Sequence, residues 1–106
     1  MTPEGKFKRD LREKIEALLP GSMVLHLDPN EIQGIPDLLI LYKNRWATLE
    51  AKAFKKAHHQ PNQDYYVKLM NDMSFSRIIY PENEQEVLDE LQQALQPRRK
   101  TRISRC

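Results

Sequence analysis

The chain has 106 residues, which is enough for one domain with a modest core and too few for two lobes. Charged residues make up 30% of the sequence but nearly balance, with a formal net charge of +2, so overall charge identifies no partner. The one cysteine, Cys106, excludes an internal disulfide and a metal site built from cysteines, which fits a reducing compartment. The polar N-terminus and the lack of a long apolar stretch predict neither a signal peptide nor a membrane span, so we expect a cytoplasmic protein.

Charge is unevenly distributed along the chain. All 15 acidic residues precede position 97, whereas every charged residue after that position is basic. These basic residues are Arg98, Arg99, Lys100, Arg102 and Arg105. We therefore expect a single domain over residues 1–96 and a flexible basic tail over residues 97–106. Such a tail is either an arm that contacts a polyanion or a solvated end, and the sequence favours neither.

The first segment has the pattern of an amphipathic helix over residues 2–19. Thr2 is a suitable N-cap, Pro3 fits the first helical position, and Glu4 fits the first turn. Apolar side chains then recur at helical spacing until Pro20-Gly21 ends the pattern. They are Phe7, Leu11, Ile15, Leu18 and Leu19.

Three strands are predicted next. Residues 22–27 form the first, and residues 37–42 are apolar on both faces, which indicates a central strand covered on two sides. Lys43-Asn44 is the only turn before residues 45–53, so the second and third strands should pair as a hairpin. By the two-residue period of a strand, Glu50 and Lys52 point to the same face.

The remaining elements complete an α/β pattern. Residues 63–73 carry apolar side chains at helical spacing, residues 75–80 form a fourth strand stopped by Pro81, and residues 84–95 form a closing helix. The order α-β-β-β-α-β-α predicts an α/β fold in which helices flank a small mixed sheet.

Three ionisable residues lie in the two most apolar strands. Asp37 opens the second strand, and Glu50 and Lys52 lie in the third, where a buried charge is costly unless it is paired or binds a metal. If the strands pair, Asp37 approaches Glu50, and neighbouring carboxylates repel unless a cation lies between them. Oxygen ligands of this kind suit Mg²⁺ or Mn²⁺, which would activate water and stabilise charge on phosphorus. With Lys52 beside them, the set predicts a hydrolytic site for a phosphodiester.

The same residues resemble a known family. The motif of the PD-(D/E)XK nuclease superfamily resembles a pattern in this chain, namely Pro36-Asp37, a short gap and then Glu50-Ala51-Lys52. The chain also resembles the VRR-NUC branch of this superfamily, particularly its short stand-alone phage forms. The segments that carry this resemblance are Thr2-Pro3-Glu4-Gly5-Lys6, Gly34-Ile35-Pro36-Asp37, and Gln63 shortly after Pro61. The resemblance extends over residues 2–95, nearly the whole chain apart from the tail.

The resemblance implies a restriction-endonuclease-like core and a metal-dependent DNA endonuclease acting on branched DNA such as Holliday junctions or flaps. The implied catalytic set is Glu4, Asp37, Glu50, Lys52 and Gln63. Of these, Asp37 and Glu50 would bind Mg²⁺ or Mn²⁺ together with the backbone carbonyl of Ala51, and Glu4 would do so through water. Lys52 would be the catalytic lysine. The stand-alone members further imply a homodimer, in the host cytoplasm if a phage encodes it.

Simpler interpretations remain for these residues. Asp37 after Pro36 would suit a turn, Glu50 and Lys52 a solvated strand face, and Glu4 the complement of a helix dipole. The main alternative function is a non-catalytic nucleic-acid-binding module on the same scaffold. That alternative predicts DNA binding that ignores metal and survives Asp37→Ala.

Basic side chains elsewhere are candidates for contacts with the phosphate backbone of DNA. They lie on the first helix, in the polar loop before the second helix, and in the tail. The candidates are Lys6, Arg9, Lys55, Lys56, His58, His59, Arg98, Arg99 and Lys100. An ordinary solvated surface explains the same residues equally well. A chain this short offers little surface for reading bases, which favours selection of DNA structure over a long recognition sequence.

Overall fold

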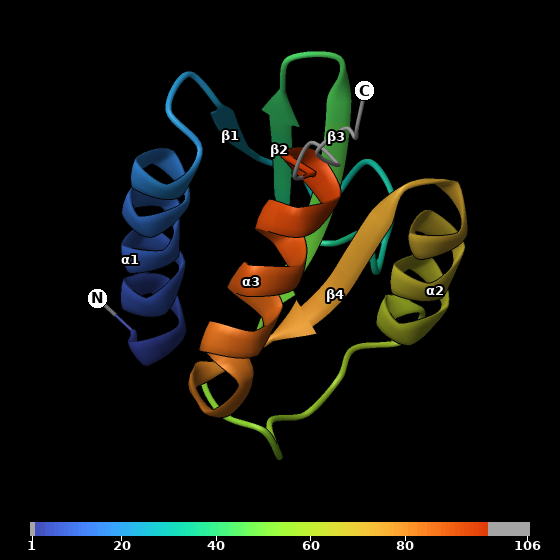
Figure 1. The fold of residues 1–106 in the computed structure, drawn as a ribbon. Helices are drawn as coiled ribbons and strands as arrows, with labels where there is room; N and C mark the ends of the chain where they lie inside the picture. Colours follow the sequence, from blue (N-terminus) through green and yellow to red (C-terminus); the bar gives the residue numbers. More distant parts are fainter. Residues whose placement is uncertain (1, 98–106) are drawn as a thin grey trace, which may run out of the picture.

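The computed structural model describes residues 2–97 (Figure 1). The helices are α1 (Pro3–Leu18), α2 (Gln63–Met73) and α3 (Glu84–Leu95), and the strands are β1 (Met23–His26), β2 (Leu38–Tyr42), β3 (Arg45–Ala51) and β4 (Phe75–Ile79). A short 3-10 turn, η1 (Pro81–Asn83), precedes α3. All predicted helices and strands are present in the predicted order, so the α-β-β-β-α-β-α prediction is confirmed. The basic residues of the predicted tail, 98–106, lie outside the described residues, and the assignment of residues 1–96 to one domain stays a prediction.

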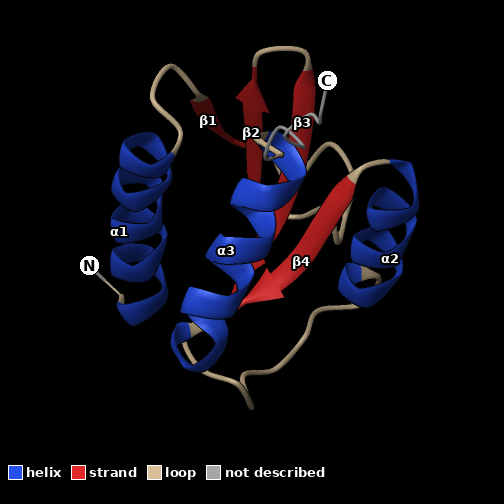
Figure 2. Ribbon diagram, in the orientation of Figure 1, coloured by secondary structure: helices blue, strands red, loops and turns tan. Residues whose placement is uncertain are grey.

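The four strands form one mixed sheet in the order β1-β2-β3-β4 (Figure 2). β1, β2 and β3 are antiparallel neighbours, with Leu25 opposite Leu39 and Leu39 opposite Thr48. β3 and β4 are parallel, because the connection through α2 returns the chain to the starting end of the sheet. The β2–β3 hairpin turns at Lys43-Asn44, as predicted, and Lys43 has a positive φ of 55°.

Local signals set the ends of α1. The Thr2 hydroxyl accepts a hydrogen bond from the Gly5 backbone N–H at 3.0 Å, and Pro3 is the first helical residue. At the other end, Gly21 turns the chain into β1 with a positive φ of 91°. α1 is therefore the amphipathic helix that the sequence predicts, shorter by one residue at each end.

Helices cover both faces of the sheet. α2 lies over the face of β3 that carries Thr48, whose hydroxyl contacts the Met70 sulfur of α2. α1 and α3 cover the opposite face, where Ala47 and Leu49 of β3 belong to the hydrophobic core. These two helices lie side by side (Figure 2), and an ion pair between α1 and the start of α3 joins them.

Most strands are slightly shorter than predicted. β2 begins at Leu38 rather than Asp37, although the Asp37 carbonyl still accepts a hydrogen bond from the Leu27 N–H at 2.8 Å. β3 ends at Ala51 rather than residue 53, because the chain leaves the sheet once the Lys52 N–H has bonded the Ile79 carbonyl at 2.8 Å. β1 is one residue shorter at each end than its predicted range, and β4 is one residue shorter at its C-terminus.

β2 is central in the sheet, but the prediction that it is covered on both sides was only half right. Its residues facing α1 and α3 are buried, whereas Leu39 and Leu41 on the other face are half-buried. The reason is that α2 packs over β3 and β4 and leaves the β1 side of that face open. On β1, Met23 and Leu25 are 56% and 36% exposed.

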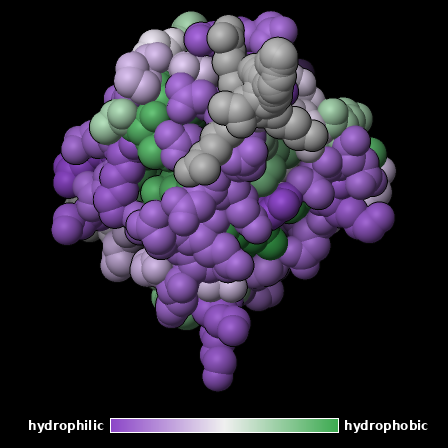
Figure 3. Space-filling model, in the orientation of Figure 1, coloured by the Kyte–Doolittle hydropathy of each residue, from purple (hydrophilic) through white to green (hydrophobic). Residues whose placement is uncertain are grey.

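The face of the molecule seen in Figure 3 is mostly hydrophilic, with smaller apolar patches between the polar residues. This matches a chain that is nearly one-third charged. No helix within residues 2–97 is long and apolar enough to cross a lipid bilayer.

Candidate active site

The sheet brings Asp37, Glu50 and Lys52 together at the ends of β2 and β3. The Asp37 carboxylate crosses from β2 and accepts a hydrogen bond from the Ala51 backbone N–H at 3.0 Å. The Lys52 ammonium lies 3.4 Å from Glu50 Oε2, so the two side chains share a face as the strand period predicts. Glu50 and Lys52 are 1% and 5% exposed, which rules out a solvated strand face.

Gln63, the first residue of α2, links the acid to the lysine. Its carboxamide N–H donates to Glu50 Oε2 at 2.7 Å, and its carbonyl oxygen accepts from Lys52 Nζ at 2.6 Å. The same oxygen accepts from the Gln60 backbone N–H at 2.8 Å. Lys52 Nζ also donates to the His58 carbonyl at 3.2 Å. Gln63 is therefore buried inside the site rather than exposed on the helix surface.

Gly34 determines where α2 begins. Its φ is 91°, and a Cβ at this position would lie 2.7 Å from the Cβ of Asn62 and 2.8 Å from the carbonyl oxygen of Pro61. Only glycine tolerates both the backbone conformation and the close approach. Asn62 itself has a positive φ of 72° directly before Gln63. The contact between these two loops therefore lies directly before Gln63, the residue that links the acid to the lysine.

Glu50 is the most perturbed acid of the site. Its burial, and next the Asp37 carboxylate, raise its pKa from 4.5 to about 7, and the Lys52 ammonium opposes this rise only in part. Glu50 Oε2 has two partners, but Glu50 Oε1 is buried with no hydrogen-bond partner among the described residues. A buried carboxylate oxygen without a protein partner is available to a water molecule or a cation.

The raised pKa predicts how stability changes with pH in the absence of metal. Between pH 4.5 and about 7 the folded protein holds the Glu50 proton that the unfolded chain has lost. The contribution of Glu50 to the free energy of unfolding therefore falls as pH rises through this window, by at most about 3 kcal/mol. In Glu50→Gln, the free energy of unfolding should no longer show this fall between pH 4.5 and about 7. Urea unfolding of both proteins in EDTA across this pH window measures the difference. The same dependence of the free energy of unfolding on pH in both proteins would contradict the prediction.

Glu4 joins the site through Lys8. The Lys8 ammonium lies 3.2 Å from Glu4 Oε2, one helical turn away, and 3.1 Å from Asp37 Oδ1. Although partial burial lowers it, the Asp37 and Glu4 carboxylates hold the pKa of Lys8 above its ordinary value. Within the described structure, Lys8 thus occupies a position between two of the predicted site acids.

The residues present fit a divalent cation held by two carboxylates and a backbone oxygen. Among residues 2–97, no three His, Cys, Asp or Glu side chains are arranged to hold a metal ion. Asp37 lies close enough to Glu50 for its charge to raise the pKa of that acid, and the unpartnered Glu50 Oε1 is an oxygen of the kind that Mg²⁺ or Mn²⁺ binds. A third oxygen would have to come from the backbone, for which Ala51 between Glu50 and Lys52 stays the prediction.

The residues predicted to contact DNA differ in their surroundings, and the structure does not group them into one surface. Lys6, Arg9, Lys55 and Lys56 are exposed, as phosphate contacts require. His59 Nδ1 lies 2.9 Å from the Asp64 carboxylate, so its ring is engaged within the protein. His58 is exposed and contributes its carbonyl to Lys52. Arg98, Arg99 and Lys100 lie outside the described residues.

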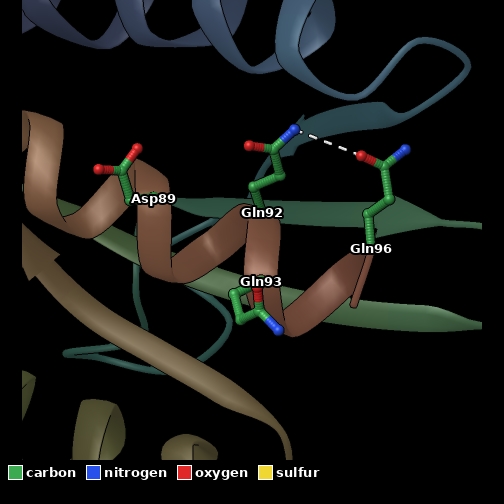
Figure 4. Close-up of a pocket in the computed structure, with 4 residues that line it drawn as sticks. All are labelled: Asp89, Gln92, Gln93 and Gln96. Atoms are coloured by element: carbon green, nitrogen blue, oxygen red, sulfur yellow. Dashed lines mark hydrogen bonds between the residues drawn. The ribbon is translucent and has the colours of Figure 1, made fainter. Parts of the chain in front are cut away.

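Two hollows bear on the location of the site. One, of about 500 Å³, opens beside Asp37 and Gln63 between the β1–β2 loop and the loop before α2. The other, of about 400 Å³, lies along α3 (Figure 4), where the side chains that line it come from one helix and Gln92 bonds Gln96 at 3.3 Å. The α3 hollow contains neither Lys52 nor either predicted metal ligand, so the hollow beside Asp37 belongs to the candidate site.

Sequence reasoning missed Lys8 as a site residue and Gly34 as a packing residue. Lys8 follows Glu4 by four positions, which places both on one helical face, so the spacing was a usable signal. Gly34 belongs to a recognised motif, but its contact with Asn62 joins segments far apart in the sequence. No local pattern reports such a contact.

Comparison with known proteins supports the fold. No family model matches the chain, and no curated protein matches it in sequence. A solved structure described as "VRR_NUC domain" is similar over 86% of this chain and 95% of that one, with a TM-score of 0.65 and 23% sequence identity. The chain therefore has the fold of a VRR_NUC domain.

Proposed function

We propose that this protein is a metal-dependent DNA endonuclease that hydrolyses phosphodiester bonds and selects branched DNA. The observation that carries the proposal is the buried set of Asp37, Glu50 and Lys52, held at one end of the sheet with a carboxylate oxygen left unpartnered. Burying such a set is costly, and a purely structural role gives no reason for it.

Each residue has a role that its position supports. Asp37 and Glu50 would hold Mg²⁺ or Mn²⁺ with the Ala51 carbonyl, and the cation would lower the pKa of water and neutralise charge on phosphorus. Lys52 would orient the attacking water or neutralise a phosphoryl oxygen. Gln63 positions both Lys52 and Glu50 through its two hydrogen bonds. Glu4 would assist through water.

DNA would be held mainly by its backbone. Lys6 and Arg9 on α1 and Lys55 and Lys56 in the loop before α2 are exposed cations on elements that also supply the site. Contacts to phosphates supply affinity without reading sequence, which supports selection of DNA structure.

The test is cleavage of labelled linear duplex, single strand, flap, fork and four-way junction, each with Mg²⁺, Mn²⁺ or EDTA. We expect cutting with either metal and none in EDTA, with branched substrates cut faster than linear duplex. Cutting that persists in EDTA would refute metal dependence. Equal rates on all duplex substrates would refute structure selectivity while leaving the nuclease activity in place.

The alternative is a non-catalytic DNA-binding module on the same scaffold. It predicts that no substrate is cut under any metal condition and that DNA still binds in EDTA, also after Asp37→Ala. The raised pKa of Glu50 and its unpartnered oxygen argue against it, since a binding module gains nothing from an acid that opposes the bound phosphate.

A homodimer is supported by one open surface, the β1–β2 patch, which lies on the α2 side of the sheet. Its residues are Met23, Leu25, Leu39, Leu41 and Trp46, which register places on one face. Apolar side chains are exposed at β1 and half-buried at β2 and β3. A second copy packed there would complete the cover that α2 provides only for β3 and β4, and would place two sites on one branched substrate.

Sedimentation tests the dimer. Wild type should sediment as a dimer, and Met23→Glu/Leu25→Glu should sediment as a folded monomer, because two charges in the patch disfavour its burial. The matched control is Met73→Glu, since Met73 is 65% exposed at the end of α2, outside the patch. A monomeric wild type, or a double variant that stays dimeric, would refute this interface.

A further inference from the structure

The hollow beside Asp37 adjoins the candidate site. Its volume is about 500 Å³, within the range of pockets that bind small ligands. The β1–β2 loop provides one wall with Pro29, Asn30, Gln33 and Ile35, and Gln60 provides the other. Asp37 and Gln63 form the end that meets the predicted metal site.

The chemistry of the wall is unlike that of a phosphate site. Among residues 2–97, no lysine, arginine or histidine lines it, and the one charged lining residue is Asp37, whose carboxylate repels a phosphate. The side chains of Asn30, Gln33 and Gln60 make no hydrogen bond to another described residue, so their donors and acceptors are available. Pro29 and Ile35 add apolar surface.

We propose that this hollow is a subsite for the base of one unpaired nucleotide next to the cleaved phosphate. Neutral carboxamides that both donate and accept match the edge of a base, as Asn and Gln do in base recognition elsewhere. The apolar residues match the flat face of a base. This subsite rests on the proposed nuclease function and specifies its substrate as DNA with an unpaired base at the cut.

Such a subsite would make the protein select its DNA substrate by structure rather than by base sequence. Placing a stacked, paired base in the hollow requires breaking its pair and its stacking, which costs little for a base that is already unpaired. Flaps, bulges and junctions supply such bases, and a fully paired linear duplex does not. Flexible carboxamides can adjust to different bases, so the subsite would distinguish paired from unpaired nucleotides more strongly than one base from another.

The hollow on α3 provides an internal control (Figure 4). It is lined by Asp89, Gln92, Gln93 and Gln96, so it has a similar mixture of one carboxylate and several carboxamides. Its described lining comes from α3 and its C-cap Gln96, with no apolar residue among it and none of the predicted catalytic residues. Substitutions there change the same kind of side chain without changing the candidate subsite.

The test measures binding in EDTA with two DNA duplexes that differ at one position of the same strand. One carries an unpaired thymine bulge and the other an abasic residue at the bulge. Wild type should bind the thymine bulge about fivefold tighter or more, since each carboxamide–base contact is of that size. Asn30→Ala/Gln33→Ala should lose this ratio, and Gln92→Ala/Gln93→Ala should retain it, with thermal unfolding showing that both are folded.

Equal affinity of wild type for the two duplexes would overturn the subsite, as would a double variant at Asn30 and Gln33 that keeps the ratio. Cleavage assays with Mg²⁺ or Mn²⁺ separate this result from the proposed function. Metal-dependent cutting without base discrimination removes the subsite and leaves the nuclease. Base discrimination without cutting of any substrate keeps the binding of an unpaired base in the hollow and removes the nuclease.

Discussion

Glu50→Gln and Lys52→Met are each expected to lower the cleavage rate by about a hundredfold or more while DNA binding changes little. Glu50→Gln keeps the size of the side chain and can still accept from Gln63, but it removes the charge that would hold the cation. Lys52→Met keeps the length of the side chain and removes the ammonium that bonds Gln63 and faces Glu50. Single-turnover cleavage and DNA affinity, measured on the same preparations, separate catalysis from binding.

Matched controls are available on exposed faces. Lys68→Met on α2 and Glu86→Gln on α3 make the same chemical changes at exposed positions outside the site, and both should cleave at the wild-type rate. Because Lys52 is buried, the folding of Lys52→Met must be checked by thermal unfolding. Wild-type cleavage by folded Glu50→Gln would mean that the buried set is structural and that the active site lies elsewhere.

Gly34→Ala is expected to be strongly destabilising. The added methyl group would meet Asn62 at 2.7 Å and the Pro61 carbonyl at 2.8 Å, and alanine is strained at a φ of 91°. Strain of about 1–2 kcal/mol and overpacking of about 1–3 kcal/mol together predict a loss of roughly 2–5 kcal/mol. The melting temperature should fall by roughly 10 °C or more.

Gly21→Ala separates the two causes. Gly21 has the same φ of 91°, but nothing lies within 4 Å of a Cβ built there. This variant should therefore lose only the smaller, conformational part of the stability and keep full cleavage activity. Gly34→Ala should also lose cleavage at temperatures where it is folded, because the displaced Asn62 moves Gln63. Equal melting temperatures for the two variants would show that the contact of Gly34 with Asn62 and Pro61 does not contribute to stability.

The elements were predictable because local patterns determine them. Helical spacing in α1, the Thr2 cap and the two-residue turn at Lys43-Asn44 each act over a few residues, and the structure confirms all three. The meeting of Asp37 with the end of β3 follows from the same hairpin, since a tight turn leaves little freedom in register.

The remaining features depend on contacts between distant segments. Lys8 is one of several basic residues on α1; its spacing from Glu4 is a local signal, but its contact with Asp37 depends on how that helix packs. The open face at Leu39 and Leu41 depends on how far α2 extends across the sheet, which the apolar pattern of β2 does not report. The exposed loop positions Asn30 and Gln33 carry no periodic signal, although together with Gln60 they line one hollow.

A divalent cation in the proposed site would have to compete with Lys8 for Asp37. The Lys8 ammonium contacts the Glu4 and Asp37 carboxylates at 3.2 and 3.1 Å, so a divalent ion that took Asp37 Oδ1 as a ligand would have to displace this ammonium. The cost of that displacement would lower the apparent affinity for metal, whereas in the metal-free protein the ammonium reduces the repulsion between the two acids. Once displaced, the ammonium would be a positive charge at the edge of the site, where it could pair with a DNA phosphate. A single lysine would then link the arrival of metal to the capture of substrate.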